Sequence, residues 1–173
     1  KKREKTRNID PMKDPNILAI CDQLKQDDFK FKEQKFDYLD VLLATGIQFN
    51  MSWFKSTQIN IFAFMGVVEK ISMEFAVAYS KMTLSYAMKN HSTIPKHMNN
   101  ITVSFPLLLS SCIDDDAKQW IQQGPKSQLG FIEMPIILDT ENNDVLLCNK
   151  STRRSGNKKF LATLVQKYFN TTK

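Results

Sequence analysis

The sequence lacks an apolar run long enough to cross a membrane as a helix. The longest such stretch, residues 59–68, is interrupted by Asn60, whereas a spanning helix needs about twenty apolar residues. Only two histidines occur, His91 and His97, and neither belongs to a metal-binding pattern. The order of glycines and lysine that defines a P-loop is also missing. The sequence therefore gives no sign of a spanning helix, a histidine metal site or a P-loop nucleotide site.

Cysteine is scarce, and its spacing excludes two common kinds of site. The residues Cys21, Cys112 and Cys148 are far apart and form no CxxC pair, which excludes a zinc ribbon and a dithiol redox centre. We expect three buried free thiols, which suit a reducing compartment such as the cytoplasm. Cys112 is a candidate nucleophile, because it lies between an expected strand and a helix start, where a thiolate is stabilised. A small buried residue at a strand end is the alternative.

Positive charge is in mild excess and is concentrated at the start of the chain. The chain has 24 Lys and Arg against 18 Asp and Glu, a net charge of +6, and half of that excess falls in residues 1–10. The remainder is close to neutral for its size, so its partner need not be a polyanion, and nucleic acid is a weak expectation. The basic segment KKREKTR is typical of the cytoplasmic flank of a membrane helix. A membrane anchor upstream of Lys1 is therefore one hypothesis, and a solvated start is the other.

Length and composition favour one folded domain behind a short basic lead. With 173 residues, 42% of them apolar, the chain is of single-domain size and can bury most of its unfolded surface. We expect a flexible lead over residues 1–13 and a single compact domain over residues 14–173. Asp14 can cap a helix that begins at Pro15. The apolar face of that helix consists of Ile17, Ile20, Cys21 and Leu24.

The segment between this helix and residue 58 permits more than one assignment. The charged stretch 25–35 either extends the helix or forms a loop. Residues 36–43 fit one face of a helix that Gly46 would end, and a short strand is the competing interpretation. For Trp53 and Phe54 we favour an interface, where aromatic anchors are common, over the stacking of nucleic-acid bases.

A βαβ unit is the clearest pattern in the sequence. Residues 59–65 are mostly β-branched, aromatic or long apolar residues and are followed by Gly66, which favours a buried strand that the glycine ends. A helix over residues 67–89 follows, because apolar residues recur there every three or four positions. Residues 101–112 form a second buried strand, in which Pro106 requires an edge position or a bulge.

The C-terminal part predicts a short helix, a hairpin and a last helix. Residues 114–116 open the short helix and Gly124-Pro125 closes it, with Trp120 packed in the core. Strands at 131–138 and 145–148 flank the turn DTENND. The last helix buries Phe160, Leu161, Leu164, Val165 and Tyr168. We therefore expect an α+β fold with a mixed sheet of about four strands, made of the βαβ unit and the hairpin, with helices packed against it.

From residue 59 to residue 169 the order βαβ then ββα is similar to that of thioredoxin-like domains. Met134-Pro135 at the start of the third strand is similar to the proline that opens that strand there. No cysteine follows Gly66, where the redox pair would be expected. The resemblance thus implies a thioredoxin-like topology without the redox chemistry.

Acidic and basic residues around the hairpin raise the hypothesis of a metal-dependent nuclease or a phosphate-substrate hydrolase. Glu133, Asp139 and Lys150 are its candidate residues, since such sites combine metal-binding carboxylates with a lysine. No Asp/Glu-x-Lys triplet lies in the hairpin. Asp139 and Asp144 also stand where turns favour aspartate, so the turn is the alternative explanation.

Two further segments are candidates for ion binding. The carboxylates of residues 114–116 could hold Mg²⁺ or Ca²⁺, but helix capping accounts for all three aspartates. The loop before the last helix combines hydroxyls with basic side chains and can hold a phosphate, with a solvated loop as the alternative. The metal candidates are Asp114, Asp115 and Asp116, and the anion candidates are Lys150, Arg153, Arg154 and Lys158.

Taken together, these patterns favour an intracellular binding or regulatory module over an enzyme. The candidate catalytic residues form no recognisable constellation, and no cofactor is predicted. We expect the edge of the hairpin and the basic loop behind it to contact a protein partner or a phosphate-bearing ligand. The hydrolase and the membrane-tethered cytosolic domain remain as alternatives.

Overall fold

The computed structural model describes residues 7–37, 39–52, 55–92, 99–124, 130–148 and 157–170. They form an α+β fold with one mixed sheet of eight strands and four α-helices. The strands are β1 (Asn8–Ile9), β2 (Lys30–Phe36), β3 (Leu39–Ser52), β4 (Lys55–Val68), β5 (Asn99–Ser110), β6 (Phe131–Glu133), β7 (Ile136–Asp139) and β8 (Asp144–Leu147). The helices are α1 (Pro15–Lys25), α2 (Met73–Asn90), α3 (Asp115–Gln123) and α4 (Asn157–Tyr168), with a 3-10 turn η1 at Pro11–Lys13.

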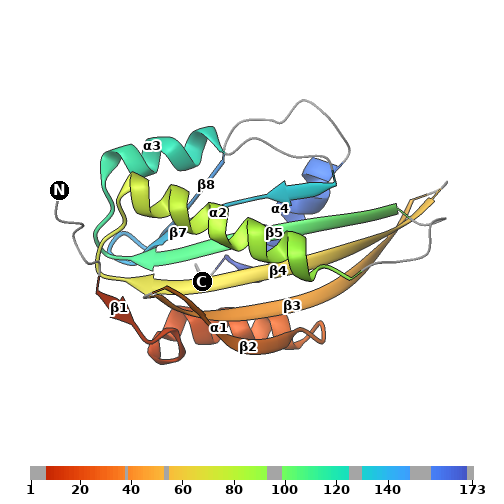
Figure 1. Cartoon of the computed structure of the whole chain (residues 1–173), viewed down its shortest axis with the longest axis horizontal. Helices are drawn as coiled ribbons and strands as arrows, with labels where there is room; N and C mark the ends of the chain where they lie inside the picture. Colours follow the sequence, from red (N-terminus) through yellow and green to blue (C-terminus); the bar gives the residue numbers. More distant parts are fainter. Residues whose placement is uncertain are drawn as a thin grey trace.

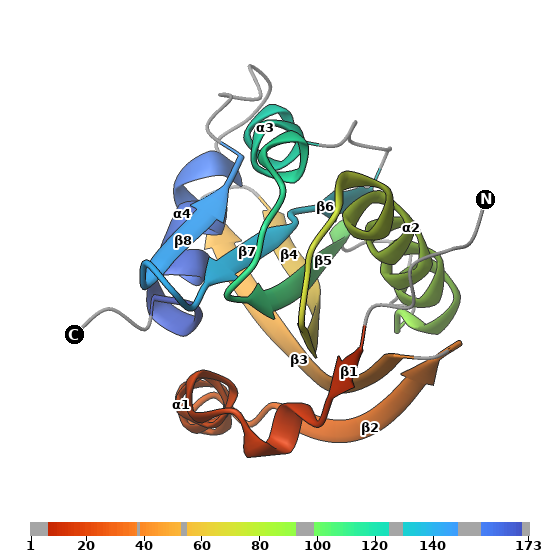
Figure 2. The ribbon, with the colours of Figure 1, turned by 90° about the vertical axis from the view of Figure 1, so that its left-hand side faces the viewer.

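The sheet lies between two helical layers. Its strand order is β2-β3-β4-β5-β7-β8, with β1 paired to one end of β4 and β6 paired to β5. Helices α2 and α3 cover one face, and α1 and α4 cover the other (Figures 1 and 2). A sheet covered on both faces must be apolar on both faces in its middle.

Strand β4 is the centre of this arrangement. It pairs antiparallel with β3 on one side and parallel with β5 on the other. Its residues from Gln58 to Val68 are buried whichever face they point to. This explains why residues 59–65 are apolar at every position except Asn60 rather than alternating with polar residues. It confirms the expected buried strand and the parallel βαβ unit.

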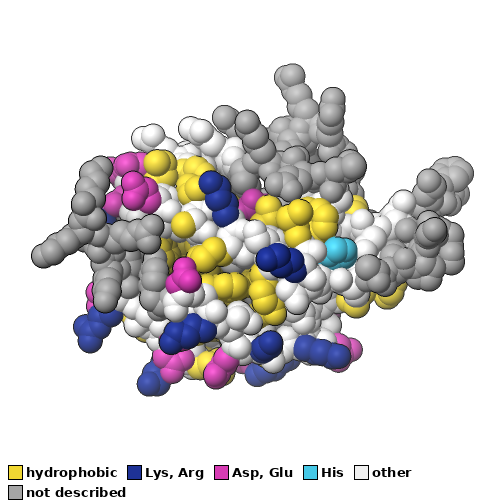
Figure 3. Space-filling view, viewed as in Figure 1, with side chains coloured by type: hydrophobic (Ala, Val, Ile, Leu, Met, Phe, Trp, Pro, Cys, Tyr) yellow, Lys and Arg dark blue, Asp and Glu magenta, His cyan; other side chains and the backbone are white. Residues whose placement is uncertain are grey.

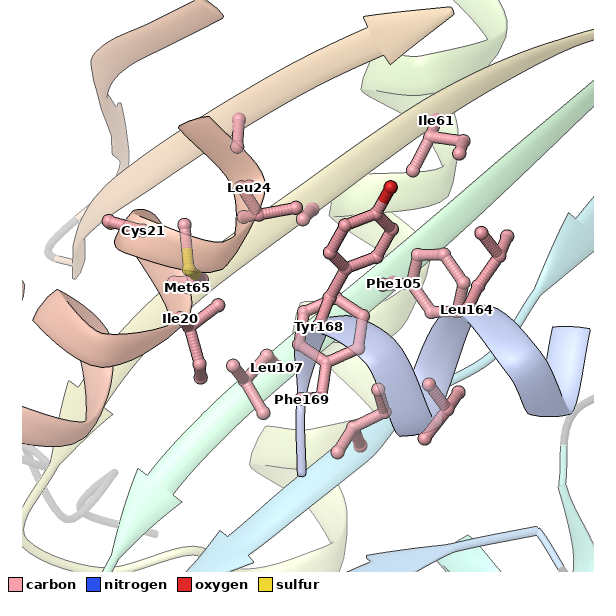
Figure 4. Close-up of a cluster of buried hydrophobic side chains, with 14 of the residues drawn as sticks. Ile20, Cys21, Leu24, Ile61, Met65, Phe105, Leu107, Leu164, Tyr168 and Phe169 are labelled. Carbon is pink, nitrogen blue, oxygen red and sulfur yellow. The ribbon is translucent and has the colours of Figure 1, made fainter. Parts of the chain in front are cut away.

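The face under α1 and α4 holds the larger apolar cluster (Figure 4). Ile20, Cys21 and Leu24 from α1 approach Met65 of β4 and Leu107 of β5, while Leu164, Tyr168 and Phe169 lie over Phe105. The helix start is as expected, because Asp14 Oδ1 accepts hydrogen bonds from the amides of Asn16 and Ile17 at 2.8 and 3.3 Å. The predicted apolar faces of the first and last helices are thus confirmed.

Aromatic side chains dominate the opposite face, under α2. Phe64 lies with its ring centroid 5.7 Å from that of Tyr86, in an edge-to-face arrangement that is favoured for aromatic pairs. Tyr79 is fully buried, and its hydroxyl donates to the carbonyl oxygen of Phe64 at 3.0 Å. This bond satisfies the one polar atom of a large buried ring and ties α2 to the central strand. Trp120 of α3 packs against this cluster while partly buried.

The N-terminal half contains more strand than the sequence patterns indicate. The charged stretch 25–35 contributes β2, and the expected helix over residues 36–43 is wrong, because β3 begins at Leu39 and continues through Gly46 to Ser52. The apolar residues near 39–43 fit a helical spacing because β3 is buried on both faces there, which removes the alternation typical of a strand. The four-stranded sheet is therefore extended by this meander.

Three boundaries also differ from the expectation. Gly66 does not end its strand, and α2 begins at Met73, where the hydroxyl of Ser72 accepts a hydrogen bond from the amide of Phe75 at 3.2 Å. Residues 8 and 9, expected within the flexible lead, pair with Val68 and Val67 as β1. The folded part therefore begins before residue 14.

Pro106 lies in a central strand, between β4 on one side and β6 and β7 on the other. Its position in the register falls opposite the break between β6 and β7, where Pro135 stands. Neither proline has an N–H to donate, so both fall where the pairing is interrupted. A central interruption thus replaces the expected edge position or bulge.

The C-terminal elements follow the expectation in type and order. α3 ends at Gly124, and the hairpin and the last helix are present. The thioredoxin-like topology is not the topology of this sheet, however. There the hairpin lies beside the first strand of the βαβ unit, whereas here β7 pairs with the second strand, β5, and β3 occupies the free side of β4.

We predict that Gly46→Val destabilises the protein. A Cβ atom at Gly46 would lie 2.7 Å from the Phe29 ring, which is 6% exposed and packs edge-to-face on Tyr168. Although valine favours strands, crowding this ring should lower the free energy of unfolding by about 1–3 kcal/mol. Urea denaturation measures it. Ile47→Val, at a side chain 51% exposed, is the control and should stay within about 0.5 kcal/mol of the wild type. A Gly46→Val protein as stable as the wild type would contradict this packing.

Candidate functional site

The outer edge of the C-terminal hairpin is the surface expected from the sequence to contact a partner. β8 is the last strand of the sheet, and among the described residues it pairs only with β7. Val145 and Leu147 pack against the α1/α4 cluster, and Leu146 packs against the α2/α3 cluster. The strand thus presents apolar side chains to both layers, and its outer backbone edge has no pairing partner in the part of the chain that the structure describes.

A groove of about 220 Å³ runs between β8 and α4. Asp144, Val145 and Leu147 form its strand wall, and Val165 and Gln166 of α4 form the opposite wall, with Asn170 just beyond the helix. The walls combine apolar surface with amide groups and one carboxylate. Such a hollow suits an apolar side chain that enters beside the strand.

Asp139 organises the turn of this hairpin. Its carboxylate accepts hydrogen bonds from the amides of Glu141 and Asn142 at 3.0 and 3.1 Å and from Asn142 Nδ2 at 2.8 Å. Burial favours a raised pKa for this carboxyl group, but the hydrogen bonds from Asn142 and Glu141 outweigh it and hold the pKa of Asp139 below its usual value. The side chain is fully engaged in the turn, the alternative that the sequence already offered.

Glu133 lies in a different environment, on β6 under α2. It is half-buried, and its neighbour in the register is Ser104 of β5. Burial raises the pKa of Glu133 to about 7, and only the charge of Lys81 on α2 opposes the shift. Among the described residues, the buried hydroxyls of Ser80 and Ser104 have no hydrogen-bond partner. This region of the interior is therefore costly for a charged carboxylate.

The structure does not bring Glu133 and Asp139 together. Their register partners on β5 are Ser104 and Ser110, six residues apart, which corresponds to about 20 Å along a strand. Lys150 lies outside the described residues. Two carboxylates that bind one catalytic metal must share its coordination sphere, within about 5 Å of each other. The carboxylate pair of the hydrolase hypothesis is thus not assembled.

The three aspartates at residues 114–116 lie at the start of α3, as expected. Asp114 is the N-cap residue, but its side chain accepts no capping hydrogen bond, which differs from the expectation. Its Oδ1 lies 3.2 Å from Lys70 Nζ instead. Asp115 and Asp116 are exposed in the first turn, where they favour the positive end of the helix dipole. In the part of the chain that the structure describes, no group of three or more His, Cys, Asp or Glu is placed to hold a metal ion.

None of the three cysteines forms a disulfide bond, and they are not all buried. Cys21 lies in the core, and burial raises its pKa to about 11. Cys148 is half-buried and Cys112 is exposed. Three buried thiols were expected, and this is wrong because Cys112 lies in the turn between β5 and α3 rather than inside the strand. The amide of Cys112 donates a hydrogen bond to the hydroxyl oxygen of Ser110 at 3.0 Å.

Several candidate residues fall outside the described residues. They are Lys150, Arg153 and Arg154 of the basic loop, Trp53 and Phe54, and His97. Lys158 lies in α4. His91 ends α2, and its Nδ1 lies 2.8 Å from the carbonyl oxygen of Met88. The anion-binding loop therefore stays a prediction.

Sequence reasoning missed the α4 side of the groove. Val165 was expected on the apolar face of the last helix and Gln166 follows it directly, whereas Asn170 lies beyond the end of α4 at Tyr168, so no helical spacing indicated it. The sequence did not indicate that the end of α4 packs beside β8, because this depends on how a strand and a helix meet in three dimensions.

Comparison of the chain with protein-family models, with curated proteins and with solved structures found no match. Within the described residues, no helix is both long enough and apolar enough to cross a membrane.

We predict that Glu133→Gln changes how stability depends on pH. The pKa of Glu133 rises from 4.5 to about 7 in the fold, so the folded protein retains a proton that the unfolded chain has already lost. The free energy of unfolding of the wild type therefore begins to fall above pH 4.5 and stops falling above about pH 7. Relative to the variant, the wild type should lose on the order of 2 kcal/mol between pH 4.5 and pH 8.

Urea denaturation of both proteins at several pH values measures this difference. Glu141→Gln removes an exposed carboxylate from the turn between β7 and β8 and serves as the control, for which no such slope is expected. A stability difference between Glu133→Gln and the wild type that is the same at pH 4.5 and pH 8 would show that Glu133 is not desolvated in the fold.

Proposed function

We propose that the protein is a non-catalytic binding module that accepts an extended peptide segment of a protein partner along the outer edge of β8. The observation that carries this proposal is the coincidence of a terminal strand with an apolar sequence and a groove beside it. An exposed strand edge offers main-chain donors and acceptors to a partner strand, and neighbouring pockets supply specificity.

The two ends of the sheet differ in a way that supports this choice. β2 forms the other edge of the sheet and has four exposed charged side chains, Lys30, Lys32, Glu33 and Lys35. Figure 3 shows basic and acidic side chains along this margin of the molecule. Charged residues, lysine above all, protect an edge strand from pairing with other chains. β8 has a single charged residue, Asp144, followed by three apolar ones.

The groove indicates which kind of segment fits. Because side chains alternate across a strand, every second residue of an added strand would point toward α4. There the walls formed by Val145, Leu147 and Val165 favour an apolar side chain, and Asp144 and Gln166 provide polar partners at the ends. A volume of about 220 Å³ accommodates one or two aliphatic side chains, so we expect a short apolar anchor in the partner.

The alternatives have less support. The hydrolase needs Glu133 and Asp139 in one site, and their register positions keep them apart. Binding of a phosphate by Lys150, Arg153, Arg154 and Lys158 and attachment to a membrane remain predictions from the sequence alone.

We predict that Val145→Lys weakens peptide binding. Peptides selected for binding to the wild type from a random display library should bind the variant at least about tenfold more weakly, because a lysine on an edge strand opposes strand addition and fills the groove. Fluorescence anisotropy measures the affinity, and circular dichroism verifies the fold. Glu33→Lys places the same residue on the β2 edge and should leave the affinity unchanged.

Three outcomes would contradict this proposal. No peptide is retained by the wild type, or both variants weaken binding equally, or Val145→Lys has no effect. A dimer in size-exclusion chromatography that Val145→Lys dissociates would assign the β8 edge to a second copy of the chain instead.

A further inference from the structure

A second, larger hollow lies where the parallel strands end. β4, β5 and β7 run in the same direction, so their carboxyl ends lie side by side at one end of the strands. An open pocket of about 430 Å³ lies there, beneath the start of α1 and beside Thr140, which follows β7. Ligands of open α/β sheets bind at the carboxyl ends of the strands, and this volume is within the range of small-molecule sites.

The floor of the pocket is apolar and fixed in place. Val67 and Leu109 are neighbours in the register and are 5% and 0% exposed. Beyond these two residues, hydrogen bonds connect the chain segments that follow β4 and β5. The amide of Ile71 donates to the carbonyl oxygen of Cys112 at 2.9 Å, and the amide of Asp114 donates to the carbonyl oxygen of Ile71 at 3.0 Å. The pocket is therefore formed before any ligand binds.

The rim has two carboxylates, Asp14 and Glu69, and no lysine or arginine is among the described residues that line the pocket. Asp14 Oδ1 caps α1, and its Oδ2 accepts no hydrogen bond from the described residues. Glu69 Oε1 lies 3.5 Å from the guanidinium of Arg7, in a pair whose side chains are 52% and 80% exposed. Such exposed pairs are weak. The guanidinium of Arg7 is therefore a cation beside this rim that another cation can displace.

We propose that this pocket binds a small organic cation, a primary ammonium group on a short apolar body. The ammonium group interacts with the carboxylates of Asp14 and Glu69, and the hydroxyls of Ser111 and Thr140 lie within the same lining. The apolar body packs against Ile9, which lines the pocket and is 40% exposed. The site shares no lining residue with the β8 groove, so the two proposals stand or fall separately.

The test is a titration of the full ¹⁵N-labelled chain with n-butylammonium, butyrate or butan-1-ol at constant ionic strength. We expect saturating amide shifts with butylammonium alone, clustered at Ile9, Ser111 and Thr140. Glu69→Gln and Asp14→Asn should each weaken binding by about tenfold or more, the loss expected for a hydrogen bond to a charged group. Asparagine caps helices as well as aspartate, so Asp14→Asn keeps the start of α1.

Two matched variants separate this site from general electrostatic attraction. Arg7→Met removes the competing guanidinium and should tighten binding of butylammonium, whereas Asp144→Asn, which removes a carboxylate from the β8 groove, should leave it unchanged. The proposal is overturned if butyrate or butan-1-ol shifts the same amides equally, if butylammonium produces no saturating shifts, or if neither Glu69→Gln nor Asp14→Asn weakens binding.

Discussion

The double pairing of β4 is the constraint on which the rest of the structure depends. This strand is held by β3 on one side and by β5 on the other, and helices cover both of its faces. Most of its buried residues must therefore be apolar, and the buried polar side chain of Asn60 is hydrogen-bonded to Asn100 and Ser92. The antiparallel β3 continues into the β2 edge, and the parallel β5 leads to the hairpin and the β8 edge. The two edges of the sheet therefore come from different parts of the chain, and they differ in chemistry: β2 is charged and β8 is mostly apolar.

Both proposed sites lie at the limits of the sheet rather than within it. The interior is filled by apolar and aromatic side chains, and a charged group there meets a large desolvation cost. Glu133 illustrates the cost, since burial raises its pKa to about 7. At the outer edge of β8 and at the carboxyl ends of the parallel strands, by contrast, open pockets place polar groups beside apolar walls. Recognition needs this combination, because apolar contact supplies affinity and the polar groups select the ligand.

Elements stabilised by local signals could be predicted, and elements stabilised by distant partners could not. Asp14 and Pro15 start α1 by bonds within three residues, and Gly124 ends α3, so a pattern was enough. β2 has a charged sequence that becomes a strand only because β3 lies beside it. Gly46 suggested the end of a helix, whereas in the fold it lies in mid-strand under the ring of Phe29. For the candidate site the same division holds: Asp139 could be assigned to a turn, but neither its separation from Glu133 nor the groove beside α4 could be derived.

The sequence by itself determined the α+β class, the parallel βαβ unit, the hairpin and the apolar faces of the first and last helices, because each of these is encoded in the spacing of neighbouring residues. Only the tertiary structure decided that the hairpin joins β5 rather than β4, that β8 forms an apolar edge, and that Asp14 and Glu69 line one pocket. These outcomes depend on which distant segments pair and pack, and residue spacing along the chain has no information about free-energy differences between alternative pairings of the same strands.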